Sequence, residues 1–218
     1  MKHEIASFRH GEQLIAHWPE WAELQSVIQG IKQEDVLRAH REGLGGRPVG
    51  AQKSFNLLFH ERLTGILGWR SQVLVFPTPA SARAAGLPPP DSPFPERKID
   101  FMKNHLGLEV VFNNESYLER ILFRLNVASE SDYVIPENEV VAGVIVLASE
   151  QIKRWGGMDP SVATFEGAVR TIGLVRQAFS VPLLLVGLFP DDDDWPRLSA
   201  DFGRGRTTES SSELASDT

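Results

Sequence analysis

The chain has 218 residues, of which 42% are hydrophobic, so it can bury one sizeable core. It contains no cysteine, which excludes disulfides and thiolate metal sites. No apolar run reaches the roughly 18 residues of a membrane-spanning helix, and the N-terminal segment lacks the apolar region of a signal peptide. We therefore expect a cytoplasmic protein that is not attached to a membrane.

Acidic charge is concentrated at one end of the chain, whose formal net charge is −7. Residues 191–218 hold eight Asp or Glu and three Arg, a net charge of −5, which leaves −2 for the rest. We expect this Ser/Thr-rich segment to be disordered and residues 1–190 to form one domain. Because the domain is nearly neutral, its charge neither supports nor excludes a nucleic-acid partner.

The first 76 residues predict two helices and a short strand. Residues 17–31 suit a helix, with a proline in the first turn and apolar residues at helical spacing: Trp21, Leu24, Ile28 and Ile31. Residues 41–50 read as a glycine-rich loop. A second helix is predicted over 51–67, with one apolar face: Phe55, Leu58, Phe59 and Leu63. A strand over 72–76 follows.

Two segments have an unusual composition, one rich in glycine and one rich in proline. The glycines of residues 41–50 do not follow a strand in the order of a phosphate-binding loop, so we expect no nucleotide cofactor. Residues 77–97 are dense in proline and small residues, which are poor in helix and strand interiors. We expect this segment to be a surface excursion within one domain.

The remaining residues alternate between helices and strands. Strands 98–101 and 106–112 are expected to pair, and helices are predicted over 116–127 and 164–179. Two further strands are apolar throughout, at 140–148 and 181–189. Because helices alternate with fully apolar strands, the sequence predicts an α/β fold whose sheet is covered on both faces.

Two carboxylates stand in the predicted strand pair, Asp100 and Glu109. If the strands pair antiparallel, these side chains lie close together across the polar connection 102–105. Two carboxylates held close repel unless a cation lies between them, and Mg²⁺ is the usual one. The alternative is structural: each acid is solvated or pairs with Lys103 or another base.

Side chains alternate along a strand, so Glu109 and Val111 share one face. A metal-dependent nuclease normally has a third polar group at this place in the strand, position 111, where this sequence has valine.

The hairpin resembles that of a known family. Ile99-Asp100-Phe101, followed nine residues after the aspartate by Glu109-Val110-Val111-Phe112, is similar to the catalytic hairpin of the BglII and BstYI restriction endonucleases, in the PD-(D/E)XK nuclease superfamily. Further segments match in order, over about residues 12–190: the helix 17–31, Asn56–Leu63 with Gly68-Trp69, Thr164-Phe165-Glu166, and the strand from Val181-Pro182.

The resemblance implies a restriction-endonuclease-like mixed sheet flanked by helices on both faces. It also implies a Mg²⁺-dependent type II enzyme that cuts palindromic double-stranded DNA as a homodimer. The two named relatives cut sites with a central GATC, which makes a GATC-centred site the first expectation.

By position, Asp100 and Glu109 would bind the metal ion together with the backbone carbonyl of Val110. Gln72 matches a polar position near the active site of one relative. The loop 156–163 corresponds to a region that the family uses near DNA.

Four further side chains are predicted to contact DNA. Asn113 and Asn114 fall where the family approaches base edges, and an amide can bind adenine through two hydrogen bonds. Arg120 and Arg124, one helical turn apart, are candidates for phosphate contacts, although a solvated helix face is the alternative.

Val111 departs from this resemblance, because the third catalytic position is Gln in the two named relatives and Glu or Lys elsewhere in the superfamily. Valine cannot orient the attacking water, and misplacing a nucleophile costs on the order of 100-fold in rate. The alternative function is therefore a weakened or inactive DNA-binding protein on a nuclease scaffold.

Overall fold

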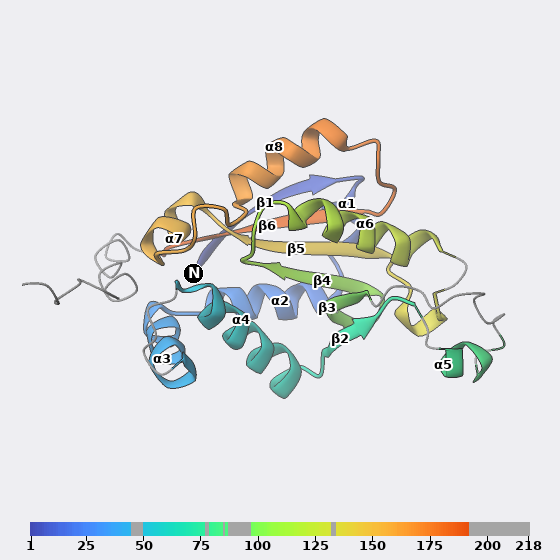
Figure 1. Ribbon diagram of the computed structural model, residues 1–218, viewed down its shortest axis with the longest axis horizontal. Helices are drawn as coiled ribbons and strands as arrows, with labels where there is room; N and C mark the ends of the chain where they lie inside the picture. Colours follow the sequence, from blue (N-terminus) through green and yellow to red (C-terminus); the bar gives the residue numbers. More distant parts are fainter. Residues whose placement is uncertain (45–49, 77–78, 85, 87–96, 132–133, 192–218) are drawn as a thin grey trace, which may run out of the picture.

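The structure is a computed structural model, and it describes residues 1–44, 50–76, 79–84, 86, 97–131 and 134–191. Within these residues, six strands form one sheet in the order β1-β6-β5-β4-β3-β2 (Figure 1). The strands are β1 (Lys2–Phe8), β2 (Arg70–Leu74), β3 (Lys98–Lys103), β4 (Leu106–Val111), β5 (Ala142–Ala148) and β6 (Leu183–Phe189).

Helices lie on both sides of this sheet (Figure 1). They are α1 (Gly11–Ile15), α2 (Pro19–Gly30), α3 (Gln33–Leu44), α4 (Gln52–His60), α5 (Pro79–Ala84), α6 (Tyr117–Glu130), α7 (Glu150–Trp155) and α8 (Phe165–Val175). A π-helical turn, η1 (Glu61–Ile66), continues α4, and a 3-10 turn, η2 (Pro136–Asn138), precedes β5. None of the helices in the described part of the chain combines the length and the apolarity that a membrane crossing requires.

The sheet is mixed. The central strands β4, β5 and β6 run parallel, whereas β1, β3 and β2 pair antiparallel with their neighbours. Parallel strands that are buried on both faces need apolar side chains throughout, which explains the continuous apolar runs of β5 and β6.

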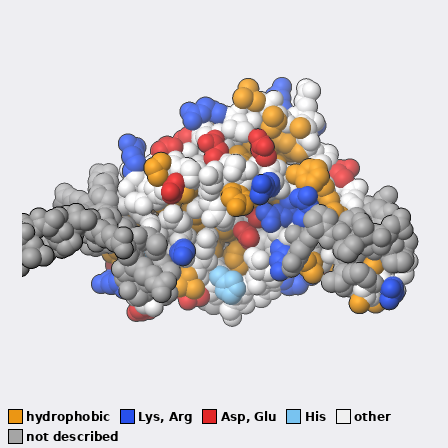
Figure 2. Space-filling model, viewed as in Figure 1, with side chains coloured by type: hydrophobic (Ala, Val, Ile, Leu, Met, Phe, Trp, Pro, Cys, Tyr) orange, Lys and Arg blue, Asp and Glu red, His pale blue; other side chains and the backbone are white. Residues whose placement is uncertain are grey.

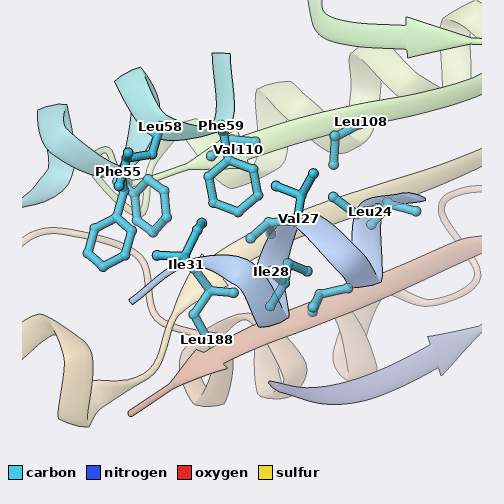
Figure 3. Packing of buried hydrophobic residues seen from close by; sticks show 14 of the residues in the cluster. Leu24, Val27, Ile28, Ile31, Phe55, Leu58, Phe59, Leu108, Val110 and Leu188 are labelled. Atoms are coloured by element: carbon cyan, nitrogen blue, oxygen red, sulfur yellow. The ribbon is translucent and has the colours of Figure 1, made fainter. Parts of the chain in front are cut away.

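Two apolar layers cover the two faces. Leu108 and Val110 of β4 point into the layer under α2 and α4, where Figure 3 shows them beside Leu24 and Phe59. Val111, on the opposite face of β4, packs in the layer under α6 and α8. The α/β fold with a sheet covered on both faces is therefore confirmed.

The predicted helices and strands form, with shifted ends. Helix α2 has its proline in the first turn, and the four apolar residues predicted to face the core are buried: Trp21, Leu24, Ile28 and Ile31. The same holds for the second helix, in which Phe55 and Leu63 lie on either side of the change to η1. Within the described residues, five helices and strands were not predicted: β1, α1, α3, α5 and α7.

The segments of unusual composition fall partly outside the described residues. Helix α3 extends to Leu44, into the predicted loop 41–50, of which residues 45–49 are not described. The proline-rich segment 77–97 contains the short helix α5, a helix that its composition did not favour, and most of the rest lies outside the description. Residues 192–218 also lie outside it, so the prediction of a disordered acidic segment stays a prediction.

Paired glycines let α6 approach the sheet. Gly107 of β4 and Gly143 of β5 are partners across the parallel ladder. A Cβ atom at Gly143 would lie 3.0 Å from Leu125 Cδ1, and one at Gly107 would lie 3.1 Å from Leu125 Cδ2. The side chain of Leu125, in α6, therefore rests where two side chains are missing.

Candidate active site

A two-residue turn sets the register of the β3–β4 hairpin. Asn104 and His105 both have positive φ, 43° and 68°, as the right-handed twist of a tight hairpin favours. The ladder pairs Lys103 with Leu106 and ends with Phe101 opposite Leu108. The next facing positions are 100 and 109, so the predicted meeting of the two carboxylates is confirmed.

Asp100 takes the place of a backbone partner. Its Oδ2 accepts a hydrogen bond from the Val110 N–H at 3.1 Å, just beyond the end of the β3–β4 ladder. On the other side, Gln72 Nε2 donates to Asp100 Oδ1 at 3.4 Å. Gln72 stands opposite Asp100 in β2 with φ of 53°, while the pairs on either side of it, Ser71 with Phe101 and Val73 with Ile99, are in register.

Glu109 is a buried carboxylic acid, with 1% of its surface exposed. Burial and, next, the nearby Asp100 carboxylate raise the pKa of Glu109 well above its ordinary value, against the opposing effect of Arg124. A buried carboxylate is costly unless a cation compensates it. The hairpin therefore holds an acid whose ionised form needs a positive partner.

Arg124 of α6 is the cation beside Glu109. Its Nε lies 3.1 Å from Glu109 Oε1, and 21% of its side chain is exposed. Its terminal nitrogen also donates to the backbone carbonyl of Lys98. Neither Arg124 Nε nor Glu109 Oε1 has a partner with hydrogen-bond geometry, so the contact is an ion pair and both atoms keep capacity for another partner.

Lys103 does not pair with the two acids. Its Nζ contacts Glu23 of α2 at 2.7 Å and donates to the Leu67 carbonyl. These bonds join the tip of the hairpin to α2 and to the end of η1. The structural alternative for the acids therefore holds in part, since Glu109 has a basic neighbour whereas Asp100 accepts hydrogen bonds from an amide side chain and a backbone N–H.

Val111 makes the surface of β4 next to Glu109 apolar. The side chain is 1% exposed and packs in the same layer as Leu118 and Ile121 of α6. It leaves no polar group on β4 next to Glu109 on that face. Arg124 of α6 reaches this face from outside the hairpin.

The donor set fits a divalent cation that prefers oxygen. Glu109 presents a buried oxygen with no hydrogen-bond partner, and Asp100 lies opposite it in the hairpin. Among the described residues, no third Asp, Glu, His or Cys joins them in a metal-binding cluster. Further ligands would have to be backbone carbonyls, such as the predicted one of Val110, or water.

The residues predicted to read bases lie directly after β4. The Asn113 carbonyl accepts a hydrogen bond from Ala163 N at 2.9 Å, and Asn114 forms an isolated bridge with Val162. The loop 156–163 and the segment after the hairpin therefore adjoin one another. The Asn114 side-chain oxygen accepts from Ser116 N at 3.0 Å in the turn before α6, which leaves its NH₂ group to donate.

Positive charge borders the site on one side. In Figure 2, Lys and Arg side chains gather where α6 lies in Figure 1. Arg120 of α6 is exposed, with its guanidinium carbon 5.4 Å from the ring centroid of Tyr117. Arg97 lies 5.0 Å above the ring of Phe123, also in α6. Exposed Arg120 and partly exposed Arg97 suit a polyanionic partner.

Sequence reasoning made Arg124 a candidate for a phosphate contact, with a solvated helix face as the alternative, and missed its contact with Glu109. A signal existed, because Arg124 follows Ile121 by three residues and precedes Leu125 by one, at the border of the buried face. The distance from helix to sheet, which depends on two glycines far away in the sequence, could not be read from that pattern.

Comparison with known proteins agrees with this geometry. The family described as "Restriction endonuclease BglII/BglIII" matches residues 3–188. A crystal structure of restriction endonuclease BglII complexed with a DNA 16-mer is similar to this chain with a TM-score of 0.62 and 18% identity, over 88% of this chain and 78% of that one.

Free BglII gives a TM-score of 0.55 and 16% identity, over 88% of this chain and 82% of that one. No curated protein gives a significant match. The similar structures confirm the restriction-endonuclease-like fold. Because the family match spans most of the sequence, the chain belongs to the restriction endonuclease BglII/BglIII family and is a type II deoxyribonuclease.

Proposed function

We propose that the protein is a Mg²⁺-dependent endonuclease that hydrolyses phosphodiester bonds at a palindromic site in double-stranded DNA, and that it acts as a homodimer. The observation that carries the proposal is the pair of facing carboxylates, with Glu109 buried and Asp100 fixed by the Val110 N–H at 3.1 Å. Asp100, Glu109 and the Val110 carbonyl would hold the metal ion.

Bound Mg²⁺ supplies Lewis-acid polarisation of the scissile phosphoryl group and a more acidic water molecule. The chain contributes the geometry. Gln72 and the Val110 N–H restrain the Asp100 carboxylate, and the apolar surroundings of Glu109 strengthen its electrostatic interactions. Asn113, Asn114 and the loop 156–163 are the proposed base-reading surface, and Arg120 a proposed phosphate contact.

The test is digestion of mixed phage DNA with the purified protein and Mg²⁺, followed by sequencing of the fragment ends. We expect cuts at one palindromic sequence, with a GATC-centred site as the first candidate. Asp100→Asn should abolish cutting, because it removes a charged ligand while keeping the side-chain shape. Glu34→Gln, which removes an exposed carboxylate on α3, should leave cutting unchanged.

Sedimentation of the protein with a duplex that carries the identified site tests the homodimer, which requires two protomers per duplex. Absence of cutting across varied DNA, with the protein folded and Mg²⁺ present, would contradict the proposal.

A second candidate function, a DNA-binding protein with weak or no turnover, is favoured by Val111. This side chain is 1% exposed among apolar neighbours and offers no hydrogen bond to an attacking water. Under this candidate, the protein binds its site without cutting it, and Val111→Gln raises cutting. Cutting by the wild type at rates typical of restriction enzymes would exclude this candidate.

A further inference from the structure

We propose that Arg124 is a positioning residue of the active site. From α6, it balances the charge of Glu109 and fixes the orientation of its carboxylate, and so takes over a task that Val111 cannot perform on β4. The inference rests on the proposed function, since it assigns a role within the same site.

The geometry distinguishes Arg124 from the other cations near α6. Its Nε lies 3.1 Å from Oε1 of a carboxylate that is 1% exposed, whereas Arg120 and Arg97 rest on exposed aromatic rings. A second contact, with the Lys98 carbonyl, holds the guanidinium at the start of β3. Arg124 thus joins both strands of the catalytic hairpin to α6.

Two features hold this contact in place. The pair Gly107 and Gly143 admits Leu125, the neighbour of Arg124, close to the sheet. On the same face, Val111 packs against α6 with no polar group of its own. The guanidinium therefore reaches Glu109 on the face of β4 where the neighbouring residue of the strand, Val111, is apolar.

Arg124 and a divalent ion compete for the same acid. Two cations that approach one carboxylate repel each other, and the repulsion is strong where water is excluded. Removal of the guanidinium should therefore tighten binding of a divalent ion in the free protein. The same removal should slow cleavage, because Glu109 loses the partner that fixes its orientation and misplaced groups lower the rate by about 100-fold. Damage to the fold, in contrast, would lower both the affinity for the divalent ion and the rate of cleavage.

The first measurement is a titration of the full-length protein with Mn²⁺, without DNA and in alkaline buffer. Electron paramagnetic resonance measures the free Mn²⁺ at each step of the titration. Glu109→Gln identifies the bound ion that depends on the hairpin, and separates it from ions held by acidic residues elsewhere. We expect Arg124→Gln to raise the affinity of that ion by about tenfold, since a unit charge beside the carboxylate is removed. Arg124→Lys, which keeps the charge, should stay near the wild type.

The second measurement separates positioning from a phosphate contact. With saturating Mg²⁺, Arg124→Gln should lower kcat by about tenfold or more and leave KM for DNA unchanged, and Arg124→Lys should recover part of kcat. The dependence of DNA affinity on salt should keep its slope, because no phosphate contact is lost. The matched control is Arg41→Gln, an exposed arginine of α3, which lies across the sheet from α6 in Figure 1.

The proposal is overturned if Arg124→Gln weakens Mn²⁺ binding or leaves it unchanged, with the variant folded by circular dichroism. It is equally overturned if the salt slope falls by about one contact, the result for a phosphate-binding residue. If the wild type cuts no DNA, the proposed function fails while the Mn²⁺ titration still tests the competition at Glu109. The two failures are therefore distinguishable.

Discussion

At Asp100, the regular pairing of β3 with β4 ends and its pairing with β2 is interrupted. The facing residue of β2, Gln72, has a strained backbone conformation. The β3–β4 ladder ends one pair before Asp100, and Gln72, opposite it in β2, has φ of 53°. A left-handed conformation costs a non-glycine residue roughly 1–2 kcal/mol. Such strain often accompanies a functional constraint. Here, the conformation accompanies the hydrogen bond from the Gln72 amide to Asp100 Oδ1.

We therefore expect that replacing Gln72 with glycine makes the protein at least as stable and less active. Gln72→Gly removes both the strain and the side-chain amide. We therefore expect the free energy of unfolding to stay the same or to rise by up to about 1 kcal/mol, with an unchanged or higher melting temperature, and we expect slower cleavage. Gln72→Ala is the matched control, because it loses the same amide and keeps a Cβ. It should cut as slowly as the glycine variant and be less stable by about 1 kcal/mol. Equal stability of the two variants would refute the strain argument.

The sequence could predict the two acids because their meeting depends on local structure alone. A two-residue turn fixes the register of a hairpin, so a spacing of nine residues brings positions 100 and 109 opposite each other. The contact of Arg124 with Glu109 depends on how closely a helix lies over a sheet. That distance is set by packing, which the helical pattern of α6 does not encode.

At the scale of elements, the approach of α6 to the sheet is what joins fold and site. Leu125 occupies the space above Gly107 and Gly143, and the neighbouring Arg124 reaches Glu109. Any side chain at these glycines must lift α6 or displace Leu125. Because cores are close-packed, such a shift is passed on to adjacent contacts.

Gly143→Val tests this link between packing and the site. An added Cβ would lie 3.0 Å from Leu125 Cδ1 and 3.3 Å from Leu183 Cδ1, so overpacking should destabilise the protein by about 1–3 kcal/mol in urea unfolding. We also expect slower cleavage, because Arg124 moves with α6. Because valine favours β-strands, a loss of stability cannot be explained by a lower strand propensity.

Gly173→Ala is the control for this substitution. This glycine lies in α8, and an added Cβ would have no atom within 4 Å. Alanine there should stabilise the helix by up to about 1 kcal/mol and leave cleavage unchanged. A stable and fully active Gly143→Val variant would contradict the role of the paired glycines.

The elements that sequence reasoning missed are those that long-range contacts create. Strand β1 has alternating partial exposure and no buried residue, and its pairing with β6 near the other end of the chain defines it. Helix α3 is rich in charge, with few apolar residues such as Val36 and Ala39 buried, and α7 has only six residues. The strongly apolar β5 and β6 were predicted because burial on both faces leaves a local signature.

At the scale of the whole molecule, charge is divided between a nearly neutral domain and an acidic C-terminal segment. Residues 192–218 carry seven Asp or Glu and three Arg, a net charge of −4 out of −7. DNA is a polyanion whose non-specific binding depends on neutralised phosphates and on salt. We therefore expect the acidic segment to oppose non-specific binding by repelling phosphates and by competing for cations such as Arg97 and Arg120 near α6.

Removal of residues 192–218 should raise the affinity for duplex DNA that lacks the recognition site. At about 50 mM salt we expect a gain of several-fold, which should shrink as salt rises because screening removes the repulsion. Affinity is measured by fluorescence anisotropy with Ca²⁺ in place of Mg²⁺. A chain of full length whose seven acidic residues in this segment are replaced by Asn or Gln separates charge from length. If charge is the cause, this chain binds like the truncated one; binding like the wild type would assign the effect to length and refute the electrostatic account.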